Sequence, residues 1–230
     1  MILLGVDTSG KNGSIALARA TDHSDRSNST RQLEILEVVP LAGGTFSAQL
    51  VPQISELLAR HGLNKNHLSG FAVVSGPGSF TGLRVGLAAI KALAEVLQKP
   101  LAAVSLLEAI ASSAKTKGKI IAALDAGRGE AYVGEYAVGE RTLMRSERLI
   151  LQNDLLAEAK GLTIVTPDAK LAEAARAARL QVEQIDPPRA DATARLGWEK
   201  IASGELASPE ELEANYIRRS DAEIFAKSNS

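Results

Sequence analysis

The chain has 230 residues, which is enough for a large core and for two domains of about a hundred residues each. Its 26 Lys and Arg residues nearly balance its 27 Asp and Glu residues, so autonomous binding to nucleic acid or to an anionic membrane is not expected. It contains no cysteine, which excludes disulfides and cysteine-ligated metals. Because no signal-peptide pattern and no apolar run of membrane-spanning length is found, we expect a cytoplasmic protein without membrane contact.

The first third of the chain predicts three strands and a helix. Residues 1–6 are an apolar run that ends in Asp7 before a glycine-containing turn, and residues 14–20 form the return strand. The polar segment 21–31 is expected to be a solvated loop, and residues 33–39 a third strand. A helix is predicted over residues 46–61, where Pro52 is expected to kink the helix or to confine its regular part to later residues.

A buried strand, a Gly-Pro-Gly turn and a helix follow. The strand covers residues 71–75, and the helix covers residues 79–98 with Ser79 as its N-cap. Pro100 ends the helix, and residues 101–104 form another short strand. The order β-β-β-α-β-α-β is an α/β pattern.

The second half repeats the opening of the chain. An apolar strand over residues 119–124 ends in Asp125 before a glycine-containing turn and a return strand, as the first strand ends in Asp7. This repeat indicates an internal duplication, with a boundary between residues 104 and 105. The remaining predicted elements are helices over 106–113, 153–159, 167–179 and 192–202, strands over 162–165 and 181–185, and a tail over 203–230 whose end is expected to be mobile.

The helix over residues 79–98 is apolar around most of its circumference, so it should be covered on two sides. Gly82 and Gly86 lie on one face, although each interior glycine costs a helix about 1 kcal/mol relative to alanine. Our hypothesis is that this face docks against a helix of another subunit, and the alternative is that the same chain covers it. A bulky residue at Gly86 is then expected to impair pairing and to leave the fold largely intact.

Candidate catalytic residues are few. Asp7 and Asp125 occupy the strand ends at which actin-like proteins hold a nucleotide and its metal; alternatively, each accepts hydrogen bonds in its own turn. P-loop, dinucleotide and Gly-x-Ser-x-Gly patterns are absent, and the three histidines form no metal motif. We therefore assign no catalytic residue and no metal ligand.

The stretch Ser75-Gly76-Pro77-Gly78-Ser79-Phe80-Thr81-Gly82-Leu83-Arg84-Val85-Gly86 resembles the signature of the bacterial TsaB (YeaZ) family, which takes part in threonylcarbamoyladenosine modification of tRNA. Residues 2–8, 124–132 and 214–218 are similar to other motifs of that family. The resemblance implies an actin-like (ASKHA), duplicated RNase H-like fold, with two α/β domains and mixed sheets. The N-terminal domain, 1–104, would carry the dimerisation helices, and the C-terminal domain would cover 105–230.

The resemblance also implies a role. The chain would be a non-catalytic scaffold that pairs with and activates the paralogue TsaD, forms homodimers through the same surface and works beside the ATPase TsaE. It would need no cofactor of its own, because partner subunits bind ATP and metal, and it would meet tRNA only through the complex. The alternatives are an actin-like ATPase or kinase and, last, an M22-type glycoprotease.

Site residues follow from this resemblance. Phe46 stands where many family members have histidine, and it is expected to add apolar area beside the interface. The expected partner or dimer interface consists of Phe46, Leu50, Gly82, Leu83, Gly86, Ala89, Ile90 and Leu93. A vestigial nucleotide site would contain Asp7, Thr8, Ser9 and Asp125, and a C-terminal partner contact would contain Tyr216 and Arg218.

Overall fold

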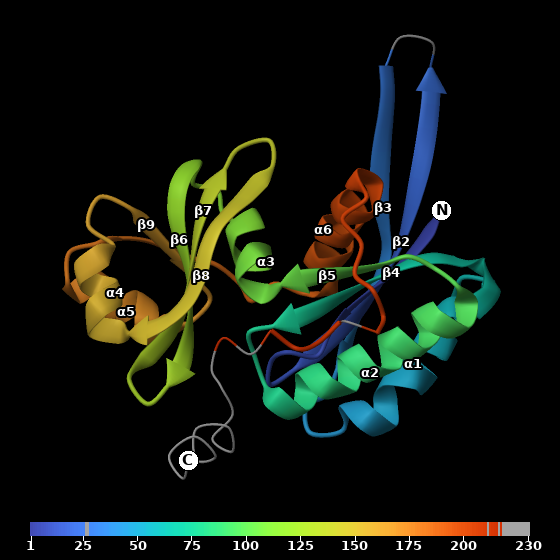
Figure 1. Cartoon of the computed structure of the whole chain (residues 1–230), viewed down its shortest axis with the longest axis horizontal. Coiled ribbons are helices and arrows are strands. Elements are labelled where there is room, and N and C mark those ends of the chain that lie inside the picture. Colours follow the sequence, from blue (N-terminus) through green and yellow to red (C-terminus); the bar gives the residue numbers. More distant parts are fainter. Residues whose placement is uncertain (26–27, 211, 216, 218–230) are drawn as a thin grey trace. The chain divides into compact units, whose positions relative to one another are not determined.

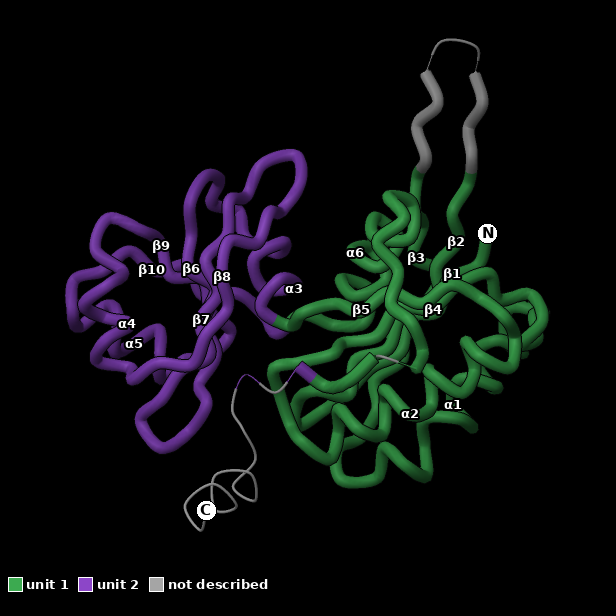
Figure 2. Tube along the Cα trace, in the orientation of Figure 1, with its two compact units in different colours: residues 1–106, 188–214 green, residues 107–187, 215–230 purple. Residues whose placement is uncertain are grey.

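The structure, a computed structural model, describes residues 1–25, 28–210, 212–215 and 217, with the backbone alone over 22–25 and 28–31. The chain divides into two compact units (Figure 2). The first contains residues 1–106 and 188–214, and the second contains residues 107–187 and the chain from 215 onward.

The first unit is built on a five-stranded mixed sheet with the order β3-β2-β1-β4-β5 (Figure 1). Strands β1, β2 and β3 are antiparallel neighbours, whereas β1, β4 and β5 are parallel. The elements are β1 (Ile2–Asp7), β2 (Gly13–Asp25), β3 (Asn28–Leu41), α1 (Phe46–Arg60), the 3-10 helix η1 (Lys65–His67), β4 (Leu68–Gly76), α2 (Phe80–Leu97), β5 (Leu101–Ser105) and α6 (Ala190–Ser203).

The second unit repeats this architecture. Its sheet has the order β8-β7-β6-β9-β10, with antiparallel pairing among the first three strands and parallel pairing from β6 through β9 to β10. The elements are α3 (Leu106–Ser112), β6 (Gly118–Gly127), β7 (Glu130–Val138), β8 (Thr142–Leu151), α4 (Gln152–Glu158), β9 (Thr163–Thr166), α5 (Ala169–Ala177) and β10 (Gln181–Gln184). The duplicated RNase H-like fold of actin-like proteins is thereby confirmed.

Helices cover both faces of the first sheet, which explains why β1 is an almost uninterrupted apolar run. Helices α1 and α2 lie on one face and α6 on the other (Figure 1). On the α6 side, Leu3, Ala16 and Ala18 pack against Ala190 and Ala194. Residues near the C-terminus therefore complete the core of the N-terminal unit.

The domain boundary predicted after residue 104 agrees with the structure within two residues, but the assignment of 105–230 to one domain is wrong over 188–214. The physical reason is the open face of the first sheet, which only α6 covers among the described elements of that unit. Apolar periodicity shows that α6 has a buried face without showing which sheet buries it.

Two local expectations are also corrected. Most of the expected loop 21–31 is strand, because β2 continues to Asp25 and β3 begins at Asn28; backbone pairing from Thr21↔Gln32 to Asp25↔Asn28 needs no apolar side chains. Pro52 lies inside α1, so the regular part of that helix does not begin after it.

Candidate functional site

The turn after β1 holds its aspartate by local hydrogen bonds. The Asp7 carboxylate is buried and accepts one bond from the Ser9 backbone N–H at 2.8 Å and one from the Ser9 hydroxyl at 2.6 Å. Burial raises the pKa of Asp7, and the two bonds from Ser9 oppose that rise. These contacts are those of an aspartate that stabilises its own turn, and the vestigial nucleotide site stays a prediction.

The same turn packs under the N-terminal half of α2. The Thr8 hydroxyl donates to the Gly82 carbonyl oxygen at 2.7 Å, and the Ser79 N–H donates to the Ser9 carbonyl oxygen at 2.6 Å. A Cβ atom on Gly82 would lie 2.0 Å from the Thr8 carbonyl oxygen, and one on Gly86 would lie 2.3 Å from the Thr8 Oγ1 atom. Both glycines therefore leave space for the turn after β1 of the same chain. The hypothesis that this glycine face docks against a helix of another subunit is wrong.

Most of the other expected interface residues also lie in the core. Leu50, Leu83 and Ile90 are buried, as is Phe46, and a Cβ atom on Gly82 would contact the Phe46 ring. The apolar area that Phe46 adds is therefore inside the unit, and the expectation that it lies beside the interface is wrong. Among the expected interface residues, only Ala89 and Leu93 are half-exposed, so these two stay candidates for contact with a partner.

A different row of side chains faces the solvent. We define the α1–α2 outer face as a set of eight exposed residues of these two helices, seven of them apolar and one of them Arg84. Val51 is 55% exposed, Phe80 40% and Val96 75%, and the Arg84 guanidinium lies 3.7 Å from the centroid of the Phe80 ring. The members of the face are Ala48, Val51, Pro52, Phe80, Arg84, Ala88, Ala92 and Val96.

The outer face was not predicted from the sequence, although the sequence contains one signal of it. Arg84, Ala88, Ala92 and Val96 follow one another at four-residue spacing, and such residues share one side of a helix. A charged residue at the start of the row indicates the solvent side. The other three are apolar, which concealed their exposure.

A later segment of the chain covers one flank of α2. The Ala207 N–H donates to the Leu101 carbonyl oxygen at 2.8 Å, and the Lys91 ammonium donates to the Leu212 carbonyl oxygen at 2.8 Å. The Leu212 side chain is buried in the same unit. The alternative of cover by the same chain is therefore correct for the glycine face and for this flank of α2.

Asp125 lies near the end of β6, as Asp7 lies at the end of β1 in the first unit, but Asp125 is exposed. Its carboxylate accepts bonds from the Gly127 N–H at 2.8 Å and from Gln152 Nε2 at 3.1 Å. Its own N–H donates to the Asp168 carboxylate at 2.6 Å. Burial raises the pKa of Asp168, and the Asp125 charge adds to that rise. Asp168 was not predicted, although parallel strands β6 and β9 end at the same edge of the sheet.

Three of the expectations from the sequence concern metal ions, membranes and the C-terminal segment. They contain no group of three or more His, Cys, Asp or Glu side chains that could hold a metal ion. None of the helices within them is long and apolar enough to cross a membrane. Tyr216 and Arg218, the expected C-terminal partner contact, lie outside the described residues.

Comparison with known proteins gives one family. The family model described as TsaD, tRNA N6-adenosine threonylcarbamoyltransferase, matches residues 38–209. The tRNA threonylcarbamoyladenosine biosynthesis protein TsaB of Bacillus subtilis is 34% identical over 137 residues, which are 59% of this chain and 55% of that protein. An uncharacterized protein of Mycobacterium tuberculosis is 30% identical over 190 residues, which are 83% of each chain.

A solved structure agrees with the fold. YeaZ from Pseudomonas aeruginosa superposes with a TM-score of 0.71 at 24% identity, covering 94% of this chain and 99% of that one. The alignments to the TsaB proteins of Bacillus subtilis and Haemophilus influenzae cover about half of those proteins' length, 55% and 53%.

Proposed function

We propose that the chain is a non-catalytic subunit in the synthesis of tRNA threonylcarbamoyladenosine, because of the family to which it belongs. The chain is a member of the protein family of the TsaD model and, within it, of the TsaB (YeaZ) group. Its principal partner is the larger paralogue TsaD, which carries out the transfer. ATP and metal are bound by partner subunits that include TsaE, and tRNA is met through the assembled complex. A cytoplasmic location is part of the same proposal.

The observation that carries the pairing proposal is the α1–α2 outer face. Aromatic and arginine side chains dominate binding energy at protein interfaces, and here Arg84 is already stacked on the Phe80 ring. Exposed Val51 and Val96 add apolar area on the two helices, while the neighbouring alanines allow close approach of another helix. A second copy of the chain would use the same face, so homodimer and heterodimer exclude each other.

The proposed non-catalytic role is supported by the state of the strand-end carboxylates. Asp7 is buried with both of its hydrogen bonds inside the turn, and Asp125 accepts bonds from Gly127 and Gln152. All four bonds are accepted by Oδ1, so one oxygen of each carboxylate is engaged within the protein and is not available to a metal-bound nucleotide. Calorimetry with Mg-ATP tests this point: no binding is expected, whereas tight binding with turnover would favour the actin-like ATPase or kinase.

Pairing is tested by placing a charge on the outer face. Ala88→Glu combined with Val96→Glu should weaken binding to TsaD at least tenfold, because buried unpaired carboxylates are costly, and should lower threonylcarbamoyladenosine formation in a reconstituted reaction. Stability should be unchanged, since both positions are exposed. Ala202→Glu, at an exposed position of α6, is the matched control. Wild-type affinity of the double variant would place the interface elsewhere.

A further inference from the structure

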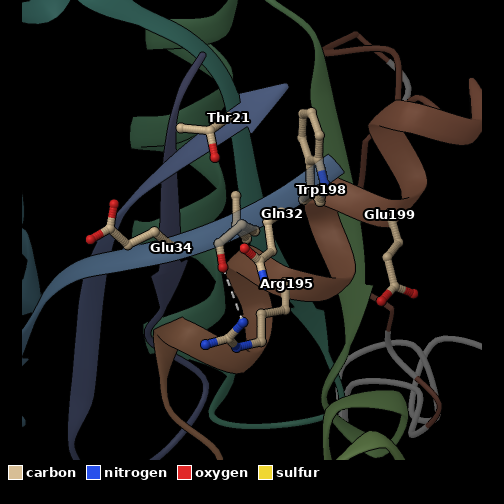
Figure 3. Close-up of a pocket in the computed structure, with 7 residues that line it drawn as sticks. Thr21, Gln32, Glu34, Arg195, Trp198 and Glu199 are labelled. Carbon is tan, nitrogen blue, oxygen red and sulfur yellow. Dashed lines mark hydrogen bonds between the residues drawn. The ribbon is translucent and has the colours of Figure 1, made fainter. Parts of the chain in front are cut away.

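A hollow of about 670 Å³ lies in the first unit between the β2–β3 hairpin and α6 (Figure 3). None of its residues belongs to the α1–α2 outer face. Because β3 is the edge strand of its sheet, an extended segment can approach along that edge. The lining residues are Thr21, Gln32, Leu33, Glu34, Arg195, Trp198 and Glu199.

Trp198, the only tryptophan in the chain, is the aromatic residue of this hollow. Together with Leu33 it packs against the alanines of α6 and β2 that form the core on this side of the sheet, and it is only half-buried. Arg195, Trp198 and Glu199 have the i, i+3, i+4 spacing of one helix face. The core thus fixes the indole while part of its surface stays available to a ligand.

The charged side chains of the lining differ in whether they form hydrogen bonds or ion pairs within the protein. The only cation, Arg195, donates through Nη1 to the Leu33 carbonyl oxygen at 3.3 Å, drawn as a dashed line in Figure 3. Within the described part of the chain, the carboxylates of Glu34 and Glu199 form no hydrogen bond and no ion pair. Arg19 faces Glu34 in the β2–β3 register but does not form an ion pair with it. The lining therefore contains two carboxylates and one guanidinium, which gives it a formal net charge of −1.

We propose that this hollow binds a basic peptide segment of a partner protein, with an arginine or lysine side chain placed over the Trp198 indole. Tryptophan is the best aromatic partner for a cation, and a guanidinium also pairs with carboxylates through two parallel hydrogen bonds. Glu34 and Glu199 lie on opposite sides of Arg195 in Figure 3, so two basic residues of an extended segment can each reach one carboxylate. Nucleic acid is disfavoured, because the same carboxylates repel phosphates.

Binding of a peptide to the hollow can be measured by the intrinsic fluorescence of Trp198, because this is the only tryptophan in the chain. The full chain is titrated in 50 mM NaCl with the peptide acetyl-Gly-Arg-Gly-Arg-Gly-amide and with its analogue in which citrulline replaces both arginines. The arginine peptide should change the emission saturably, and the affinity should fall severalfold at 300 mM NaCl, because exposed ion pairs are screened. The uncharged analogue should bind at least about fivefold more weakly.

Variants locate the binding. Glu34→Gln with Glu199→Gln should weaken the arginine peptide about fivefold without lowering the melting temperature, whereas Glu173→Gln, an exposed position of α5, should leave binding unchanged. Equal binding of the citrulline peptide, an unaffected double variant, or stronger quenching by a single-stranded RNA oligonucleotide would each overturn the proposal. Pairing with TsaD should be normal in the double variant, so this result and that of the outer face are independent.

Discussion

At the scale of single residues, Gly82 is a position at which the fold leaves no room for a side chain. Gly82→Ala should destabilise the protein by about 1–3 kcal/mol, because the added methyl group would overlap the Thr8 backbone carbonyl, which the buried turn holds in place. Alanine is the better helix former by about 1 kcal/mol, so propensity alone predicts the opposite sign. Urea unfolding midpoints measure the difference. Ala88→Leu, exposed on the same helix, should have a wild-type midpoint, and a Gly82→Ala midpoint as high as that of wild type would contradict the packing.

This packing also reverses the expectation for Gly86. A leucine there was expected to spare the fold and impair pairing, whereas the 2.3 Å approach to Thr8 Oγ1 places its first side-chain atom inside the core. The sequence correctly indicated that a glycine-lined face needs a close neighbour. It could not identify that neighbour, because Thr8 is more than seventy residues away in the chain.

Asp7 should make stability depend on pH. Burial raises its pKa in the folded state above the ordinary 3.8, so the folded state binds the proton more tightly than the unfolded state. Stability relative to Asp7→Asn should therefore fall as pH rises from about 4 through the folded pKa, because the carboxylate is then charged and buried. Urea unfolding at several pH values, compared between the two proteins, cancels the other carboxylates. Parallel pH profiles would show that folding does not raise the pKa of Asp7.

At the scale of elements, the attachment of α6 depends on a residue of β2. The Ala190 N–H at the start of α6 donates to the Ser14 hydroxyl oxygen at 2.8 Å in a buried position, and Arg189 supplies no side-chain cap. Ser14→Ala leaves that N–H without its partner and should cost about 1–3 kcal/mol. The loss should appear in the chemical denaturation midpoint. Ser55→Ala, at an exposed position of α1, should cost less than about 0.5 kcal/mol, and equal effects of the two changes would exclude the cap.

The elements also show what local patterns can and cannot predict. The helices of the first unit followed from apolar spacing, because each has a buried side. In the second unit, strand β8 (Thr142–Leu151) was not predicted, because none of its residues is fully buried. The ends of β2 and β3 were not predicted either, because the polar residues there are paired through the backbone alone. Nor was the outer face, since Val96 is apolar and yet 75% exposed.

At the scale of the whole molecule, the duplication was visible in two strands that end in Asp7 and Asp125, and the identical strand orders of the two sheets confirm it. The exchange of segments between units was not visible. The helix after the last strand of the second sheet, α6, packs on the first sheet, and α3, which follows the first sheet in the chain, belongs from Leu107 onward to the second unit. Two repeats in tandem are equally compatible with separate, continuous domains.

The discontinuous first unit predicts that residues 1–106 do not fold alone. Without residues 188–214, the face formed by Leu3, Ala16 and Ala18 is exposed to water, and burying one leucine contributes about 2 kcal/mol. This fragment should show collapsed helices and strands but no cooperative urea transition, whereas joining it to 188–214 through a flexible Gly-Ser linker should restore one. Circular dichroism and the dispersion of amide resonances measure both states.

The continuous fragment 107–187 is the matched control for this experiment. It keeps all five strands of the second sheet together with α4, α5 and α3 from Leu107 onward, so it should unfold cooperatively without any added segment. In the linked protein, Trp198 should show the emission of a half-buried indole, because α6 brings it against Leu33. A cooperative transition of residues 1–106 alone, at the midpoint of the linked protein, would show that α6 is dispensable and that the boundary expected from the sequence is the physical one.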